Sequence, residues 1–151
     1  MVNMISFKNT IERIPDISCG FRNGLGALGA NSRYVTVAST RLLEGSVDID
    51  GCTEKAYPHE NRWDYVISYS GKAFFLEVHP ATEGEVKVIA AKRVWLLSWL
   101  KQKADALNSY PMGTPRLTWV HSGKCGLSKT STEYRRAALM GLVPTNLLRL
   151  K

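Results

Sequence analysis

Cysteine is scarce in this sequence and long hydrophobic runs are lacking, and both features narrow the class of protein. The three cysteines, Cys19, Cys52 and Cys125, are far apart and form no C-x-x-C pair, which argues against a zinc site or a disulfide framework. The apolar runs are far shorter than the roughly 20 residues that cross a bilayer, so we expect no membrane partner. The first residues, MVNMISFKNTIERI, are polar and amphipathic, unlike a signal peptide. Scattered free thiols suit a reducing compartment, and we expect a cytoplasmic protein.

The remaining composition is that of an ordinary globular chain with an excess of positive charge. The 151 residues are 44% apolar and 22% charged, which predicts one domain over residues 1–151 with a single core. Twenty Lys and Arg residues stand against 13 acids, giving a net charge of +7. Such an excess favours a polyanion partner, because contacts to phosphates release counterions. Solubility alone is the other interpretation of the charge.

Periodicity and turn residues predict the element order α-β-β-β-α-β-α-β, a mixed α/β (α+β) domain whose central sheet is flanked by helices. Residues 40–62 have little periodicity, and we expect a solvated loop or a short edge strand there. The expected elements are a helix at 4–14, a strand at 33–39, a hairpin of strands at 65–69 and 73–78, a long helix at 85–107, a strand at 117–121, a helix at 131–140 and a last strand at 146–150.

The predicted hairpin, W-D-Y-V-I-S-Y-S-G-K-A-F-F-L-E-V-H-P, carries two acids and an imidazole. Strand alternation puts Glu77 and His79 on one face. A turn near residues 70–72 brings Asp64 opposite residues 77–79, within a register error of about 2. Two adjacent carboxylates repel, and a divalent cation such as Mg²⁺ or Mn²⁺ would relieve that repulsion. Taken singly, each residue has an ordinary alternative as a solvated strand end or an ion-pair partner.

The order of elements and this constellation resemble the PD-(D/E)XK nuclease-like superfamily. That family has a helix, a three-stranded meander, a helix and a further strand, with an Asp at the start of the second strand and (D/E)-x-K near the end of the third. The matching positions are Asp64 and E-V-H, from Glu77 to His79, and the likeness spans residues 4–121. It implies a restriction-endonuclease-like fold in which Asp64 and Glu77 bind the metal and His79 replaces the lysine.

The histidine leaves three outcomes open, because a neutral imidazole supplies no permanent positive charge. His79 acts as the base, or a lysine on the following helix, Lys87 or Lys92, supplies the charge, or the site is inactive and the fold binds a partner. The candidate catalytic residues are therefore Asp64, Glu77, His79 and Lys92.

Basic side chains around the constellation are candidates for contacts with nucleic-acid phosphates. The loop H-S-G-K-C-G-L-S-K-T-S-T adds amides and hydroxyls beside a helix N-terminus, although a solvated loop is the ordinary alternative. The candidate nucleic-acid-binding residues are Lys72, Lys87, Arg93, Lys124 and Lys129.

Three functions remain after these steps. The favoured prediction is a metal-dependent endonuclease that hydrolyses DNA phosphodiester bonds, and a homodimer paired through residues 146–150 would let it cut both strands. The second is a catalytically inactive nuclease-like module that binds nucleic acid or a protein partner. The third is a protein-interaction domain that uses tryptophans as anchors, although helical spacing favours a core position for two of them. These tryptophans are Trp63, Trp95, Trp99 and Trp119.

Overall fold

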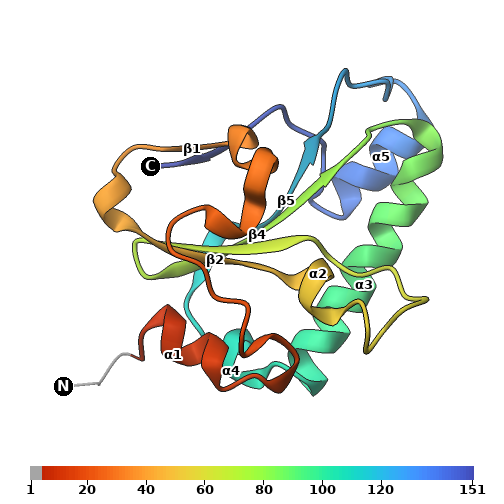
Figure 1. Ribbon diagram of the computed structural model, residues 1–151. Coiled ribbons are helices and arrows are strands. Elements are labelled where there is room, and N and C mark those ends of the chain that lie inside the picture. Colours follow the sequence, from red (N-terminus) through yellow and green to blue (C-terminus); the bar gives the residue numbers. More distant parts are fainter. Residues whose placement is uncertain (1–4) are drawn as a thin grey trace.

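The computed structural model describes residues 5–151 and centres on a mixed four-stranded sheet in the order β2-β3-β4-β5 (Figure 1). The first three strands form an antiparallel meander, and β5 runs parallel to β4. A second sheet pairs β1 with β6 in parallel. The strands are β1 (Val35–Val37), β2 (Leu43–Asp48), β3 (Tyr65–Tyr69), β4 (Lys72–His79), β5 (Met112–His121) and β6 (Leu148–Leu150).

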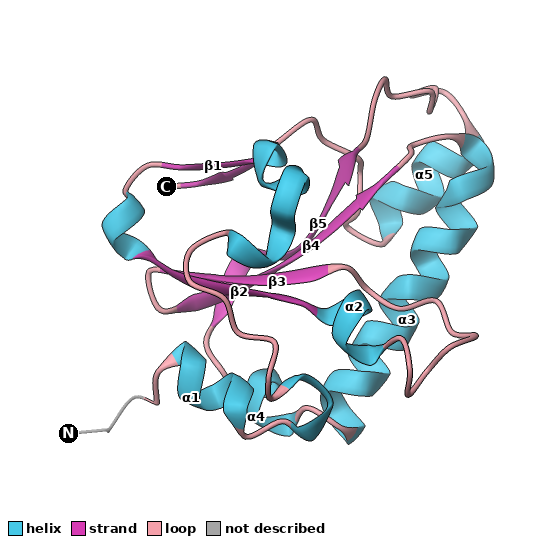
Figure 2. Ribbon diagram, viewed as in Figure 1, coloured by secondary structure: helices cyan, strands magenta, loops and turns pink. Residues whose placement is uncertain are grey.

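Helices cover one face of the central sheet, and the small β1–β6 sheet lies over the other face (Figure 2). Helix α3 connects β4 to β5, because parallel neighbours need a crossover rather than a tight turn. The α-helices are α1 (Phe7–Glu12), α2 (Ile49–Thr53), α3 (Val86–Gln102), α4 (Asp105–Asn108) and α5 (Thr132–Leu139). Short 3-10 segments span Pro15–Ile17, Gly26–Tyr34, Thr40–Leu42 and Glu83–Glu85.

Strand alternation divides the core into two clusters. Phe75 packs with the helices in the first cluster, whereas Leu76 packs in the second with Leu148 of the small sheet. The turn between β3 and β4 has two central residues with positive φ, Ser70 at 52° and Gly71 at 73°. Two such residues make the tight hairpin turn whose twist suits paired strands. The predicted hairpin is therefore confirmed, including the two faces of its second strand.

The mixed α/β fold with a mixed sheet flanked by helices is confirmed, but the predicted membership of the meander is wrong. The strand at 35–37 belongs to the small sheet. The first strand of the meander is β2, within the segment expected to be a loop or a short edge strand. Gly45 and Ser46 favour strands weakly, yet both are buried in β2 because the chain around Arg22 bridges to Ser46. The observed order is α1-β1-β2-α2-β3-β4-α3-α4-β5-α5-β6.

The helices also differ from their predicted bounds. The long helix ends at Gln102, and Ala104 leaves helical geometry at φ −134° and ψ 45° before α4 begins. Helix α1 is shorter than the predicted 4–14, and residue 4 lies outside the described residues. Among residues 5–151, no helix combines the length and the apolar character that a membrane span requires.

All four tryptophans belong to the core, so the idea that they anchor a partner is wrong. Trp63 and Trp119 are fully buried, and Trp95 and Trp99 are at most 9% exposed. Trp95 and Trp99 stack with their ring centroids 5.5 Å apart. Asp16 fixes this pair to the N-terminal part of the chain, because its Oδ2 accepts hydrogen bonds from Trp99 Nε1 at 3.0 Å and from the Tyr57 hydroxyl at 2.7 Å.

We expect Asp16→Ala to lower the free energy of unfolding by about 1–3 kcal/mol, because two donors lose their acceptor and the Trp99 indole is buried. Urea unfolding followed by tryptophan fluorescence measures the change. Glu54→Ala, at an exposed position just after α2, is the matched control and should change stability little. An equal effect of the two substitutions would contradict the role given to Asp16.

Candidate functional site

The register of the hairpin brings the two predicted carboxylates together. Tyr65 pairs with Leu76, so Asp64 stands beside Glu77 at the ends of β3 and β4. The Asp64 amide donates a hydrogen bond to Glu77 Oε1 at 3.1 Å. The Val78 amide in turn donates to Asp64 Oδ2 at 3.0 Å. The convergence predicted from strand alternation is confirmed, and each carboxylate accepts a hydrogen bond from a backbone amide of the neighbouring strand.

Lys92, the predicted lysine from the helix after β4, also reaches this point. Its Nζ lies 2.6 Å from Glu77 Oε2 and 3.7 Å from Asp64 Oδ1. Its side chain is 14% exposed, that of Asp64 is 18% exposed and that of Glu77 is fully buried. A positive charge therefore stands between two carboxylates in a place that water barely reaches, where electrostatic interactions are strong.

Burial and the neighbouring charges together shift the pKa values of Glu77 and Lys92. Burial raises the pKa of the Glu77 carboxyl well above its usual value, and the Asp64 carboxylate raises it further, while Lys92 opposes both effects. Burial by itself would lower the pKa of Lys92, but the carboxylates of Glu77 and Asp64 outweigh it, so the net shift is upward. The ammonium group is thus kept charged by the two acids that it contacts.

His79 is held by a residue that sequence reasoning missed. Its Nε2 lies 2.6 Å from Glu85 Oε2, and its Nδ1 lies 3.9 Å from Glu77 Oε2. Glu85 belongs to the 3-10 turn just before α3, six residues after His79. The sequence signal that could have identified Glu85 was the pair of acidic residues, Glu83 and Glu85, in that turn. The imidazole therefore bridges toward two carboxylates, whereas the permanent positive charge comes from Lys92.

The predicted phosphate-binding residues lie at several places around the sheet. Lys72 is exposed at the start of β4, roughly 17 Å along the strand from Glu77. Lys87 and Arg93 lie on α3, the first exposed and the second partly buried. Lys124 and Lys129 are exposed in the loop after β5. Because His79 pairs with His121, that loop begins at the same end of the sheet as the carboxylates.

Helix α2 supports Asp64 from the side of β2. The amides of Ile49 and Asp50 approach the Asp64 carbonyl oxygen at 2.8 and 3.3 Å. Asp48 begins the helix, because its Oδ1 accepts from the Gly51 amide at 2.8 Å. Asp50 accepts from Arg62 Nε at 2.9 Å. These contacts fix the backbone at Asp64, so the carboxylate is positioned by three segments of the chain.

The oxygen atoms of this site suit a small hard cation, but they do not enclose one. Asp64 and Glu77 offer carboxylate oxygens, the ligand type that Mg²⁺ and Mn²⁺ prefer. In the part of the chain that the structure describes, no three His, Cys, Asp or Glu residues are grouped so that they could hold a metal ion. Mg²⁺ sites often use one or two carboxylates and complete their coordination with water and substrate phosphate. The donor set fits that sparse type of site.

We expect Lys92→Met to lower the free energy of unfolding by about 3–5 kcal/mol near neutral pH, because the buried Glu77 carboxylate loses its partner. The loss should shrink in acid. With its pKa raised, folded Glu77 keeps a proton that the unfolded chain releases above about pH 4.3, so stability falls as pH rises beyond that value.

Urea unfolding at about pH 4.5 and about pH 8 checks this expectation. Lys87→Met, on the exposed side of α3, is the matched control and should show neither the large loss nor the pH dependence. A loss of the same size at both pH values would mean that Lys92 stabilises the protein by packing rather than by charge.

Comparison of this chain with protein-family models, with curated proteins and with solved structures found no match. The interpretation of the site therefore depends on its own geometry: two hydrogen-bonded carboxylates, a lysine shared between them and a histidine held by a further glutamate. A buried glutamate and a largely buried lysine whose pKa values are both raised, as for Glu77 and Lys92, are typical of functional sites, and ion-pair networks that serve structure alone show such shifts as well.

Proposed function

We propose that the protein is a metal-dependent nuclease that hydrolyses DNA phosphodiester bonds. One observation carries this proposal: Asp64, Glu77 and Lys92 meet at one end of the central sheet, with Lys92 Nζ 2.6 Å from Glu77 and 3.7 Å from Asp64. Two acids and a lysine are the side chains that the resemblance to PD-(D/E)XK nucleases requires. Here the lysine comes from α3 rather than from the strand position that His79 occupies.

The strand connections support the same proposal. An antiparallel meander of β2, β3 and β4, the crossover helix α3 and the parallel strand β5 follow one another in the order expected of that family's core. Asp64 stands at the start of the second meander strand, and Glu77 stands near the end of the third. We therefore propose a restriction-endonuclease-like fold in which the second sheet, β1 with β6, is an addition.

Asp64 and Glu77 would hold a Mg²⁺ or Mn²⁺ ion, and water and a phosphate oxygen would complete its coordination. When bound, such an ion polarises a phosphoryl oxygen and makes water a better nucleophile at neutral pH. The positive charge would also relieve the cost of two adjacent carboxylates, which burial imposes most strongly on Glu77.

The chain's own residues would bind and orient the substrate. Lys92, beside both carboxylates, would stabilise negative charge on the phosphate as the bond to the leaving oxygen breaks. Glu85 holds the His79 ring in one orientation. His79 Nδ1 therefore faces Glu77 and could orient the attacking water. The net charge of +7 and the exposed Lys124 and Lys129 favour a nucleic-acid backbone as the partner.

We expect Asp64→Asn to abolish metal-dependent DNA cleavage and to weaken Mn²⁺ binding, while the fold remains intact. The amide oxygen of asparagine can still accept the hydrogen bond from the Val78 amide, but the charge that attracts the ion is lost. Calorimetric titration of Mn²⁺ and cleavage of labelled single-stranded and duplex DNA measure the two effects. Asp105→Asn, at an exposed position in α4, is the matched control.

Two results would redirect the proposal. Salt-sensitive DNA binding that persists in EDTA, without cleavage by the parent protein, would identify an inactive binding module. No binding of DNA at low salt would instead favour a protein partner. Gel-filtration or light-scattering mass, measured with and without DNA, would test the expected homodimer in the same samples.

A further inference from the structure

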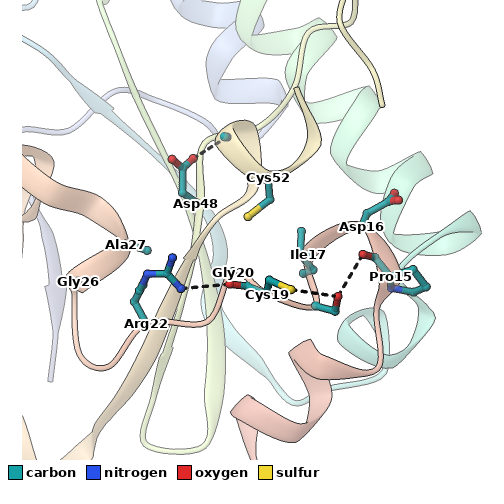
Figure 3. A pocket seen from close by; sticks show the side chains of 12 residues that line it. Pro15, Asp16, Ile17, Cys19, Gly20, Arg22, Gly26, Ala27, Asp48 and Cys52 are labelled. Atoms are coloured by element: carbon teal, nitrogen blue, oxygen red, sulfur yellow. Dashed lines mark hydrogen bonds between the residues drawn. The ribbon is translucent and has the colours of Figure 1, made fainter. Parts of the chain in front are cut away.

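A cleft of about 430 Å³ lies at the outer edge of β2, within the size range of small-ligand sites (Figure 3). Its walls come from three segments: the chain from Pro15 to Arg22, the start of the Gly26–Tyr34 segment, and the turn from Asp48 to Cys52. None of the catalytic candidates lines it. The cleft is therefore separate from the carboxylate–lysine site and needs its own explanation.

Three charged side chains line this cleft: Arg22, Asp48 and Asp16, of which Asp16 already accepts hydrogen bonds from Tyr57 and Trp99. Arg22 Nη1 donates to the carbonyl oxygens of Cys19 at 3.1 Å and Phe21 at 2.8 Å, so the guanidinium is held in place. Within residues 5–151, no carboxylate oxygen lies within 4.0 Å of that guanidinium. Figure 3 shows Arg22 and Asp48 on the left, Ile17 and Pro15 on the right, and Cys19 and Cys52 between them. Hydrogen-bond donors of Arg22 and acceptors of Asp48 thus line the same cleft.

The cleft is joined directly to the candidate active site. Asp48 pairs with Tyr65, the residue after Asp64, across β2 and β3. The amides of Ile49 and Asp50, which follow Asp48, donate to the Asp64 carbonyl oxygen. Burial raises the pKa of Asp48, and the Asp64 carboxylate is close enough to add to that shift. A ligand in the cleft would therefore lie at the edge strand that pairs with β3, the strand that begins just after Asp64.

The facing charges select the chemistry of the ligand. A carboxylate accepts two hydrogen bonds from neighbouring N–H groups, and an adjacent guanidinium donates to a carbonyl oxygen. Among the bases of DNA, guanine carries two N–H donors beside a carbonyl on its pairing edge. Cytosine offers one N–H donor group, its amine, on that edge. Ala27, which is half-buried in the wall of the cleft, can contact the face of a ring.

We propose that this cleft binds an unpaired guanine of the nucleic acid, with Asp48 accepting from its N–H groups and Arg22 donating to its carbonyl oxygen. The proposal rests on the proposed nuclease function for the source of the base. It implies a substrate that is single-stranded, or a duplex from which one nucleotide is flipped out, next to the bond that is cut. The pairing edge of a base is free for such contacts only when it has left its partner.

The test is an amide NMR titration of the parent protein, in EDTA, with deoxyguanosine, deoxycytidine, deoxyadenosine and thymidine. Nucleosides are used so that phosphate does not contribute, and inorganic phosphate is titrated separately. We expect deoxyguanosine to bind most tightly and to shift the amides of Cys19, Gly20, Ala27 and Gly51, which line the cleft.

Two substitutions assign the contacts. Asp48→Asn keeps an oxygen for the Gly51 amide but replaces one acceptor with a donor, and Arg22→Gln removes the guanidinium. Each should weaken deoxyguanosine binding about tenfold or more. Arg41→Gln, exposed near the opposite end of β2, is the control and should leave binding unchanged.

Any one of four results would overturn the proposal. These are amide shifts that fall outside the cleft, an equal response to all four nucleosides, no response at millimolar nucleoside, or full binding by Asp48→Asn and Arg22→Gln. The cleavage assay keeps the two proposals separate. Guanine binding in a parent protein that cuts no DNA would leave the cleft assignment standing and reject the nuclease. DNA cleavage without guanine binding would support the nuclease and reject the cleft assignment.

Discussion

The arrangement of the central sheet and its crossover helix depends on one buried ion pair, between Lys92 of α3 and Glu77 of β4 at 2.6 Å. A fully buried carboxylate is costly to keep charged unless a cation and hydrogen bonds compensate for lost water. Lys92 supplies the cation, and the Asp64 amide supplies a hydrogen bond. The same pair fixes how α3 lies across the sheet and concentrates charge at one end of it.

Compared with an apolar pair, burying this ion pair lowers the free energy of unfolding, which is expected where a protein keeps charged side chains for a catalytic role. An apolar pair of similar volume would fill the same space without the desolvation cost. Asp64 makes the cost larger, because it places a second negative charge beside the first. Glu85 adds a third carboxylate through its contact with His79. The partial access of the Asp64 and Lys92 side chains to solvent is the feature that supports the proposed catalytic role most.

Local rules predicted the hairpin and its carboxylates, and they failed where distant segments decide the structure. Alternation in β4 and the tight turn at Ser70 and Gly71 were enough to place Asp64 beside Glu77, since both effects act within a few residues. The sequence predicted only a loop or a short edge strand where β2 lies, because Gly45 and Ser46 become strand residues through contacts with β3 and with the chain near Arg22. Glu85 was missed because a sequence gives no distance between a turn and a preceding strand.

The small second sheet has a consequence for how the chain acquires its structure. Val35 pairs with Leu148, so a strand near the beginning must find a partner more than one hundred residues later. Such closure of a long loop is entropically costly and slows folding. During synthesis the meander and α3 can assemble while β1 is still unpaired. The surface formed by Leu28, Tyr69 and Leu76 is covered by Leu148 and Leu150 only at the end, so an unfinished chain exposes this apolar face to chaperones and to other chains.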